Sequence, residues 1–233
     1  MRSLSIFLLA TCTSILLPAA GWSEDAPYTV KGRTFNFPTP TGFCMPNSSN
    51  SNETEFVKTV QALMANSGNT VVKVAAECSQ IRRRGADRSR RVSDYIVYYY
   101  VNGTESESLE GSAQSHRKAL CDEMRQQGDA SVADVPDIVA KTAKELNSNL
   151  TVSGVKVLGV LAEDAHGCYV GLLANTRDNG GPFTMNVDML ATVIHGRSIF
   201  VALYSEYKNP SESQKSLRLE EAIAADLDSK NPD

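Results

Sequence analysis

A cluster of arginines is the sharpest local feature of this chain. The stretch IRRRGADRSRRVSD, residues 81–94, which we call the arginine segment, carries six of them in a chain whose net charge is -4. Guanidinium groups present a planar fork of donors that fits phosphate, sulfate or carboxylate groups. We interpret the segment as a candidate contact surface for an anionic lipid, an anionic glycan or an acidic protein of the envelope; a solvated loop between two strands is the alternative. Its arginines are Arg82, Arg83, Arg84, Arg88, Arg90 and Arg91.

The histidines are the next candidates for chemistry. His166 follows Glu163 and Asp164 in the stretch EDAH, and all three side chains are of types that bind metal ions. They would have to converge within one tight turn, and helical metal-binding patterns such as HExxH are absent. His195 stands before a glycine in a second expected turn, and His116 lies at the start of an expected helix. The pattern therefore favours solvated histidines, and we expect neither a metal ion nor a cofactor.

Side chains for nucleophilic catalysis also lack their usual context. The GxSxG and SxxK patterns are absent, and Ser198 of GRSIF is expected inside a strand. No glycine-rich phosphate loop is present, and Glu220 and Glu221 are expected on the solvated side of a helix. The sequence thus favours a non-catalytic binding or accessory protein over an enzyme. The alternatives are a periplasmic hydrolase or metal-dependent enzyme whose site cannot be read from the sequence, and a structural or secretion-accessory protein.

The first 23 residues have the pattern of a secretory signal peptide. Arg2 precedes an apolar run over residues 4–20, and small residues follow before the acidic pair Glu24 and Asp25. The run is interrupted and too short for a membrane span, which needs about 20 apolar residues. We expect removal of residues 1–23 and a mature domain over residues 24–233, periplasmic or secreted, with no transmembrane segment. Its charge gives no reason to expect nucleic acid as a partner.

The cysteines indicate how the mature chain is held together. Loss of the signal removes Cys12 and leaves Cys44, Cys78, Cys121 and Cys168, an even number without any CxxC pattern. An even number in an exported chain predicts two disulfides, for which three pairings are possible. We expect Cys44–Cys78 and Cys121–Cys168, because this pairing keeps each bridge within one half of the chain.

The hydrophobic pattern predicts the elements that carry these residues. Strands are expected over residues 33–44, 70–78 and 94–101, and helices over residues 54–66, around 113–124 and from 134 to 146. Two hairpins follow, turning at His166-Gly167 and His195-Gly196, and then a last helix after Pro210. The expected buried face of that helix consists of Leu219, Ala222, Ile223 and Leu227. Consecutive hairpins favour an α+β fold in which helices pack on an antiparallel sheet. We expect a single domain stapled by disulfides, and residues 103–114 form the only candidate break.

The layout of the chain also resembles known groups of proteins. The order of F-x-F-P…P-x-G-F-C, an amphipathic helix, a strand ending in cysteine, LGVLAED…CYVGLL and TVIHGRSIFVALYSEY is similar to that of small exported alphaproteobacterial proteins of unknown function. The final hairpin and helix resemble those of PsbP-like α+β proteins, which are typically non-catalytic accessory or binding proteins. Both resemblances imply an envelope protein, and neither implies a reaction or a site residue.

Overall fold

The structure is a computed structural model, and it describes residues 27–30, 32–104, 111–126 and 128–232. The expected signal peptide, residues 1–23, lies outside the described residues, as does part of the candidate break at residues 103–114. No helix among the described residues is long and apolar enough to cross a membrane.

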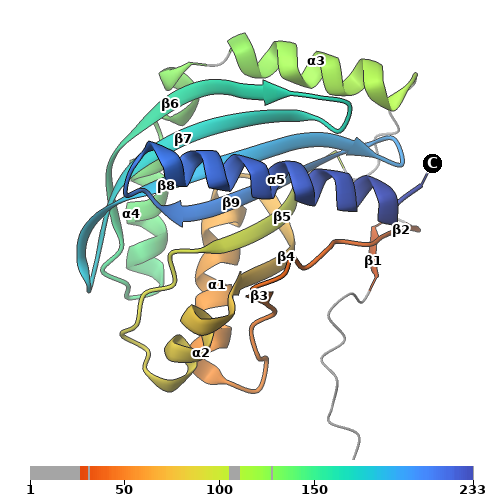
Figure 1. The fold of residues 1–233 in the computed structure, drawn as a ribbon. Helices are drawn as coiled ribbons and strands as arrows, with labels where there is room; N and C mark the ends of the chain where they lie inside the picture. The colour runs from red at the N-terminus through yellow and green to blue at the C-terminus, as the bar shows by residue number, and fades with distance from the viewer. Residues whose placement is uncertain (1–26, 31, 105–110, 127, 233) are drawn as a thin grey trace, which may run out of the picture.

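The centre of the fold is a seven-stranded sheet in which every neighbouring pair is antiparallel (Figure 1). The strand order is β3-β4-β5-β9-β8-β7-β6, and a separate hairpin of β1 and β2 precedes it. The strands are β1 (Tyr28–Val30), β2 (Arg33–Phe35), β3 (Phe43–Cys44), β4 (Asn69–Glu77), β5 (Tyr95–Val101), β6 (Thr151–Glu163), β7 (Cys168–Asp178), β8 (Gly181–Ile194) and β9 (Arg197–Glu206). The predicted hairpins form β6–β7 and β8–β9.

Helices cover both faces of this sheet. In Figure 1, α5 lies across the near face, α1 and α4 lie behind the sheet, and α3 runs along the side of β6. The helices of the described residues are α1 (Ser51–Asn66), α2 (Cys78–Ala86), α3 (Ala113–Gln126), α4 (Val135–Glu145), α5 (Pro210–Lys230) and the short 3-10 helix η1 (Asp129–Val132). The predicted α+β class and the single domain are confirmed.

Two hydrophobic cores form because successive side chains of a strand point to opposite faces of the sheet. On β5, Ile96 and Tyr98 join the core under α5, whereas Val97 and Tyr99 join the core on the side of α1. All four side chains are buried. This double burial explains why the sequence of β5 is almost continuously apolar instead of alternating.

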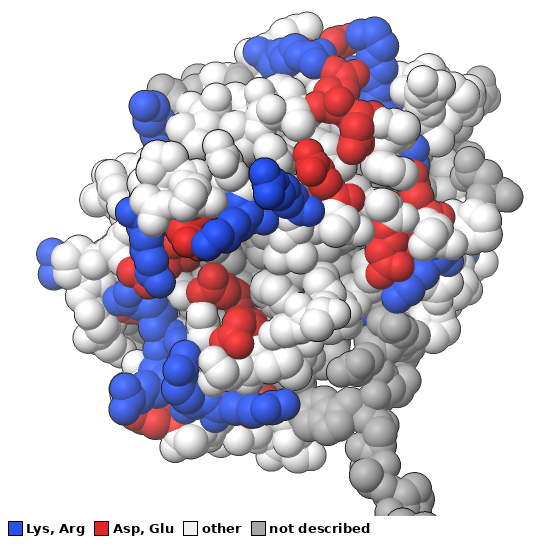
Figure 2. Space-filling model, viewed as in Figure 1, with Lys and Arg blue, Asp and Glu red and all other residues white. Residues whose placement is uncertain are grey.

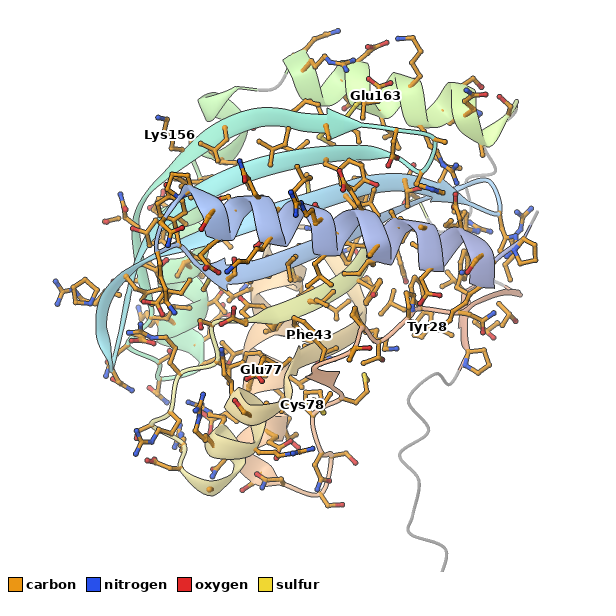
Figure 3. The ribbon with its side chains drawn as sticks, in the orientation of Figure 1. Tyr28, Phe43, Glu77, Cys78, Lys156 and Glu163 are labelled. Carbon is orange, nitrogen blue, oxygen red and sulfur yellow. A yellow bond between two sulfur atoms is a disulfide. The ribbon has the colours of Figure 1, made fainter. Side chains whose placement is uncertain are left out.

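Both predicted disulfides are present, with the predicted pairing. Cys44 of β3 is joined to Cys78, the first residue of α2, and their Cα atoms lie 4.9 Å apart. Figure 3 shows Phe43, Glu77 and Cys78 close together where these elements meet. The second bridge joins Cys121 of α3 to Cys168 of β7 and so fixes α3 to the sheet.

The arginine segment differs from the expected loop, because its first half is the helix α2. The Glu77 carboxylate caps this helix by accepting from the backbone N–H groups of Ser79 and Gln80. Gly85 lies against the start of α1, where a Cβ atom would come within 2.4 Å of the Glu53 carboxylate. The segment is therefore held against α1 at Gly85.

Candidate functional site

A cavity of about 820 Å³ lies between α1, α4 and the face of the sheet opposite α5. We call it the α1–α4 cavity. Most of its lining is apolar, and the apolar side chains come mainly from α1, α4 and the strands β6, β7 and β8. The lining includes Phe56 and Val60 of α1, Ile138 of α4, Leu172 and Ala174 of β7, and Met185 of β8.

The arrangement of the two helices leaves this space open. Both helices lie on the same face of the sheet: α1 packs over β4 near one edge, and α4 packs over β6 at the opposite edge. The side-chain amide of Asn66, at the end of α1, donates to the hydroxyl of Thr142 on α4 over 2.8 Å. The helices are thus tied near the C-terminal end of α1, and β7, β8 and Tyr204 of β9 form the floor between them.

Three of the six candidate arginines line the cavity: Arg84, Arg88 and Arg91. The structure leaves Arg82, Arg83 and Arg90 exposed outside the cavity lining, and Arg90 pairs with Asp87 over 3.2 Å. Figure 2 shows Lys and Arg side chains gathered over the lower part of the molecule, where Figure 1 draws α2. The arginine segment therefore divides into a cavity-lining set and a solvent-facing set.

Arg91 has a structural role at the cavity wall. Its Nε and Nη2 atoms donate to the two carboxylate oxygens of Asp178 over 2.8 and 2.6 Å, and its guanidinium lies 3.9 Å from the centre of the Phe183 ring. These hydrogen bonds raise the pKa of Arg91. The residue joins the segment between α2 and β5 to the β7–β8 turn, and its charge is already matched.

Arg84 and Arg88 share one carboxylate at the cavity. Arg88 donates to Glu55 Oε1 through Nε over 3.0 Å and pairs with it through Nη2 at 2.7 Å, whereas Arg84 Nη2 is 3.9 Å from the same oxygen. Arg84 Nη1 donates to the backbone carbonyl oxygens of Arg88 and Arg90. Its Nε is buried and has no hydrogen-bond partner among the described residues. Burial lowers the pKa of Arg84, whose side chain is 20% exposed, whereas that of Arg88 is 64% exposed.

Two stacked tyrosines form part of the floor. The rings of Tyr95 and Tyr204 lie 4.3 Å apart and nearly parallel. Burial raises the pKa of both phenols, that of Tyr204 to about 12, so both stay protonated at neutral pH. The cavity therefore offers apolar surface, neutral hydroxyls and the guanidinium groups of Arg84 and Arg88, which suit binding.

The histidines are placed away from the cavity lining. His166 is not the solvated turn residue that the sequence favours, because its Nδ1 lies 2.7 Å from the Asp228 carboxylate of α5. Arg117 of α3 donates to the same carboxylate over 2.7 Å, so the three residues tie the β6–β7 turn, α3 and α5 together. His195 has a positive φ of 49° in the β8–β9 turn, as a tight turn requires. Within the described parts of the chain, no group of three or more acidic, His or Cys side chains is arranged to hold a metal ion.

Sequence reasoning missed a buried acidic pair under α5. Glu220, which was expected on the solvated side of this helix, is fully buried, whereas Ala222, which was expected on its buried face, is exposed. Asp188 of β8 is also fully buried, and one of its oxygens accepts from Asn186 over 2.7 Å. Burial raises the pKa of Asp188 to about 6 and that of Glu220 well above its usual range, with the Asp188 charge as the second cause for Glu220. The signal was present, because Glu220 shares a helical stripe with Ile223 and Leu227.

The chain matches no protein-family model, and no curated protein matches it in sequence. Its function is therefore argued from the site itself.

Proposed function

We propose that the protein is an exported, non-catalytic binding protein that holds a ligand with an apolar body in the α1–α4 cavity. The cavity itself carries this proposal, because its volume of about 820 Å³ is that of a small-molecule site. Such sites are typically lined by apolar side chains with a few polar groups that fix orientation. Arg84 and Arg88 at the lining supply those polar groups here.

The chemistry of the lining favours a hydrocarbon body over a polar ligand. Water inside an apolar cavity lacks the two to four polar partners that ordered water needs. A hydrocarbon group that enters removes apolar surface from water on both sides, at roughly 25 cal/mol per Å². The side chains of Phe56, Leu172 and Met185 are available for this contact in the described cavity.

The disulfides support the exported part of the proposal. Disulfides form and persist in oxidising compartments, such as the periplasm and the extracellular space. The Cys44–Cys78 and Cys121–Cys168 bridges agree with the signal pattern of residues 1–23, which predicts the same compartment. N-terminal sequencing of the protein from a periplasmic extract should find a start near residue 24.

The binding proposal is tested with an apolar fluorescent probe. We expect N-phenyl-1-naphthylamine to brighten when it is titrated with the purified mature protein, because the cavity shields it from water. Ala174 lines the floor and is nearly buried, so Ala174→Phe should fill the cavity and lower probe affinity at least tenfold. Leu172→Trp is a second filling variant for the case in which the first is too unstable to assay.

The control is the same enlargement at a site outside the cavity. Ala222 is exposed on α5, on the other side of the sheet, and Ala222→Phe should leave probe binding unchanged. Equal probe affinity in wild type, Ala174→Phe and Leu172→Trp would show that the cavity is not a binding site.

A further inference from the structure

The charged end of the cavity holds a cation that is incompletely paired. The Arg84 side chain is only 20% exposed, and its nearest carboxylate oxygen, on Glu55, is 3.9 Å from Nη2. That separation is beyond hydrogen-bond length, and Nε has no partner among the described residues. A buried donor without an acceptor is costly in free energy, so this guanidinium retains the capacity to bind an anion.

Glu55 lies where such an anion would bind, but its carboxylate is too far from Arg84 to accept a hydrogen bond from it. Its Oε1 accepts from Arg88 over 3.0 Å, so the carboxylate is drawn toward the more exposed arginine. The Glu55 side chain is 37% exposed, and it can turn into solvent without leaving a buried charge behind. Phe56, the next residue of α1, begins the apolar part of the lining.

We infer that the ligand is a single-chain amphiphile whose anionic head group, a carboxylate or phosphate, takes the place of Glu55 on Arg84 and Arg88. Its hydrocarbon chain lies along the apolar lining of the α1–α4 cavity. The inference rests on the proposed function and adds the class of the head group. Charge-assisted hydrogen bonds to a guanidinium fork are among the strongest that proteins form, and the partly buried setting of Arg84 strengthens them.

Arg91 does not share this role. Both carboxylate oxygens of Asp178 and the carbonyl oxygen of Gly181 already accept from it. The head-group site therefore consists of Arg84 and Arg88 alone among the six arginines of the segment.

Three ligands of equal chain length separate the head group from the chain. Decanoate, 1-decanol and decylamine are titrated into the mature protein at pH 8 in low salt, and each is measured by displacement of N-phenyl-1-naphthylamine. We expect decanoate to bind at least tenfold more tightly than decanol, and decylamine to bind most weakly because it meets two guanidinium groups. Salt should weaken decanoate binding and leave decanol binding unchanged, since screening acts on the charged head alone.

Variants on α2 and α1 test the residue assignment. Arg84→Gln should weaken decanoate binding about tenfold and leave the affinity for decanol unchanged. Arg82→Gln is the control, because Arg82 lies on α2 but is exposed and outside the cavity lining. Glu55→Gln should raise decanoate affinity severalfold, since it removes the carboxylate that competes for Arg88. The two cavity variants are thus expected to act in opposite directions.

The outcomes separate this inference from the proposed function. If decanol binds as tightly as decanoate, or Arg84→Gln affects both equally, the anionic head group is wrong although the cavity still binds a chain. If neither decanoate nor decanol displaces the probe, and Ala174→Phe leaves the affinity for the probe unchanged, the cavity proposal fails as well.

Decyl phosphate, measured beside decanoate, identifies the source of the head group. Tighter binding of the phosphate supports a lipid phosphate, and tighter binding of decanoate supports a fatty acid.

Discussion

Asp188 and Glu220 are fully buried acids, and within the described residues they gain few hydrogen bonds in place of those they lose to water. Asp188 Oδ1 and both carboxylate oxygens of Glu220 are buried and lack a hydrogen bond of good geometry among the described residues. The backbone N–H of Leu190 favours the charged form of Glu220, but burial outweighs it and raises the pKa. The titratable groups that influence Glu220 on this face of the sheet are Asp188 of β8, Tyr169 of β7 and the neighbouring Glu221 on α5 itself. None of these is a cation, so the neutral forms of the two acids are favoured in the folded protein.

This pair predicts that stability falls as pH rises. The folded pKa of Asp188, about 6, lies above its ordinary value of 3.8, so the folded state binds more protons than the unfolded state between these pH values. The free energy of unfolding therefore decreases through this window, by about 3 kcal/mol for a shift of this size. We expect Asp188→Asn to raise the free energy of unfolding at pH 8 by about 1–3 kcal/mol, because it removes the buried charge.

Urea unfolding at a series of pH values measures this effect. The advantage of Asp188→Asn over wild type should shrink as pH falls toward 4, where the wild-type carboxyl is itself neutral. This dependence is the internal control, since a mere packing change would act equally at every pH. If Asp188→Asn left the free energy of unfolding at pH 8 unchanged or lowered it, the charged Asp188 carboxylate would not destabilise the folded protein.

Among the elements, those defined by strong local patterns could be predicted from the sequence. The turns at His166-Gly167 and His195-Gly196 lie between apolar runs, and they fixed the order of β6, β7, β8 and β9. The helix α2 could not be predicted in this way, because Ile81 is its only buried residue and so it has no apolar stripe. Its stability comes from the cap at Glu77 and from contact with α1, and tertiary contact of this kind leaves little trace in a short sequence window.

Only part of the candidate site could be predicted from the sequence, for a related reason. The arginine segment could be identified as a group that binds anions, but its division depends on which side of α2 and the following turn each residue occupies. The cavity depends on the spacing between α1 and α4, which are far apart in the chain: the contacting residues Asn66 and Thr142 are separated by 76 positions. No local pattern encodes that spacing.

The helix α3 is attached to the sheet through very few buried groups, and the Cys121–Cys168 bridge dominates them. Cys121 is the only residue of α3 that is buried, and the polar contacts come from Arg117 and from Arg125, which pairs with Glu163 below the helix (Figure 3). Chain-entropy arguments give about 4 kcal/mol for a loop of this length. We therefore expect replacement of both cysteines by Ala to release α3 locally and to lower the stability of the whole protein by up to about 4 kcal/mol.

Hydrogen exchange distinguishes local release from global loss. In the variant without this bridge, amides of α3 should lose protection while those of β8 and β9 keep most of theirs. Replacement of Cys44 and Cys78 by Ala is the matched control, because that bridge joins β3 to α2 and should leave the exchange of α3 unchanged. Equal loss of protection in α3 and β8 would show that α3 is an integral part of the cooperative core.

At the level of the whole molecule, both cores share one sheet, and this should make them unfold together. The side chains of β5, β8 and β9 contribute to the core under α5 and to the core beside the α1–α4 cavity. Loss of either core would expose the apolar side chains on one face of these shared strands to water. We expect one calorimetric transition for the mature protein with its disulfides intact.

A ligand in the α1–α4 cavity should shift that single transition as a whole. A ligand at about 100 times its dissociation constant adds about 2.7 kcal/mol to the free energy of unfolding. For a domain of this size, that corresponds to a rise in Tm of roughly 5–10 °C. Differential scanning calorimetry with decanoate should show this rise in wild type and in Ala222→Phe, but not in Ala174→Phe, whose cavity is filled. If the ligand instead splits the transition in two, the cores unfold independently and the shared sheet does not couple them.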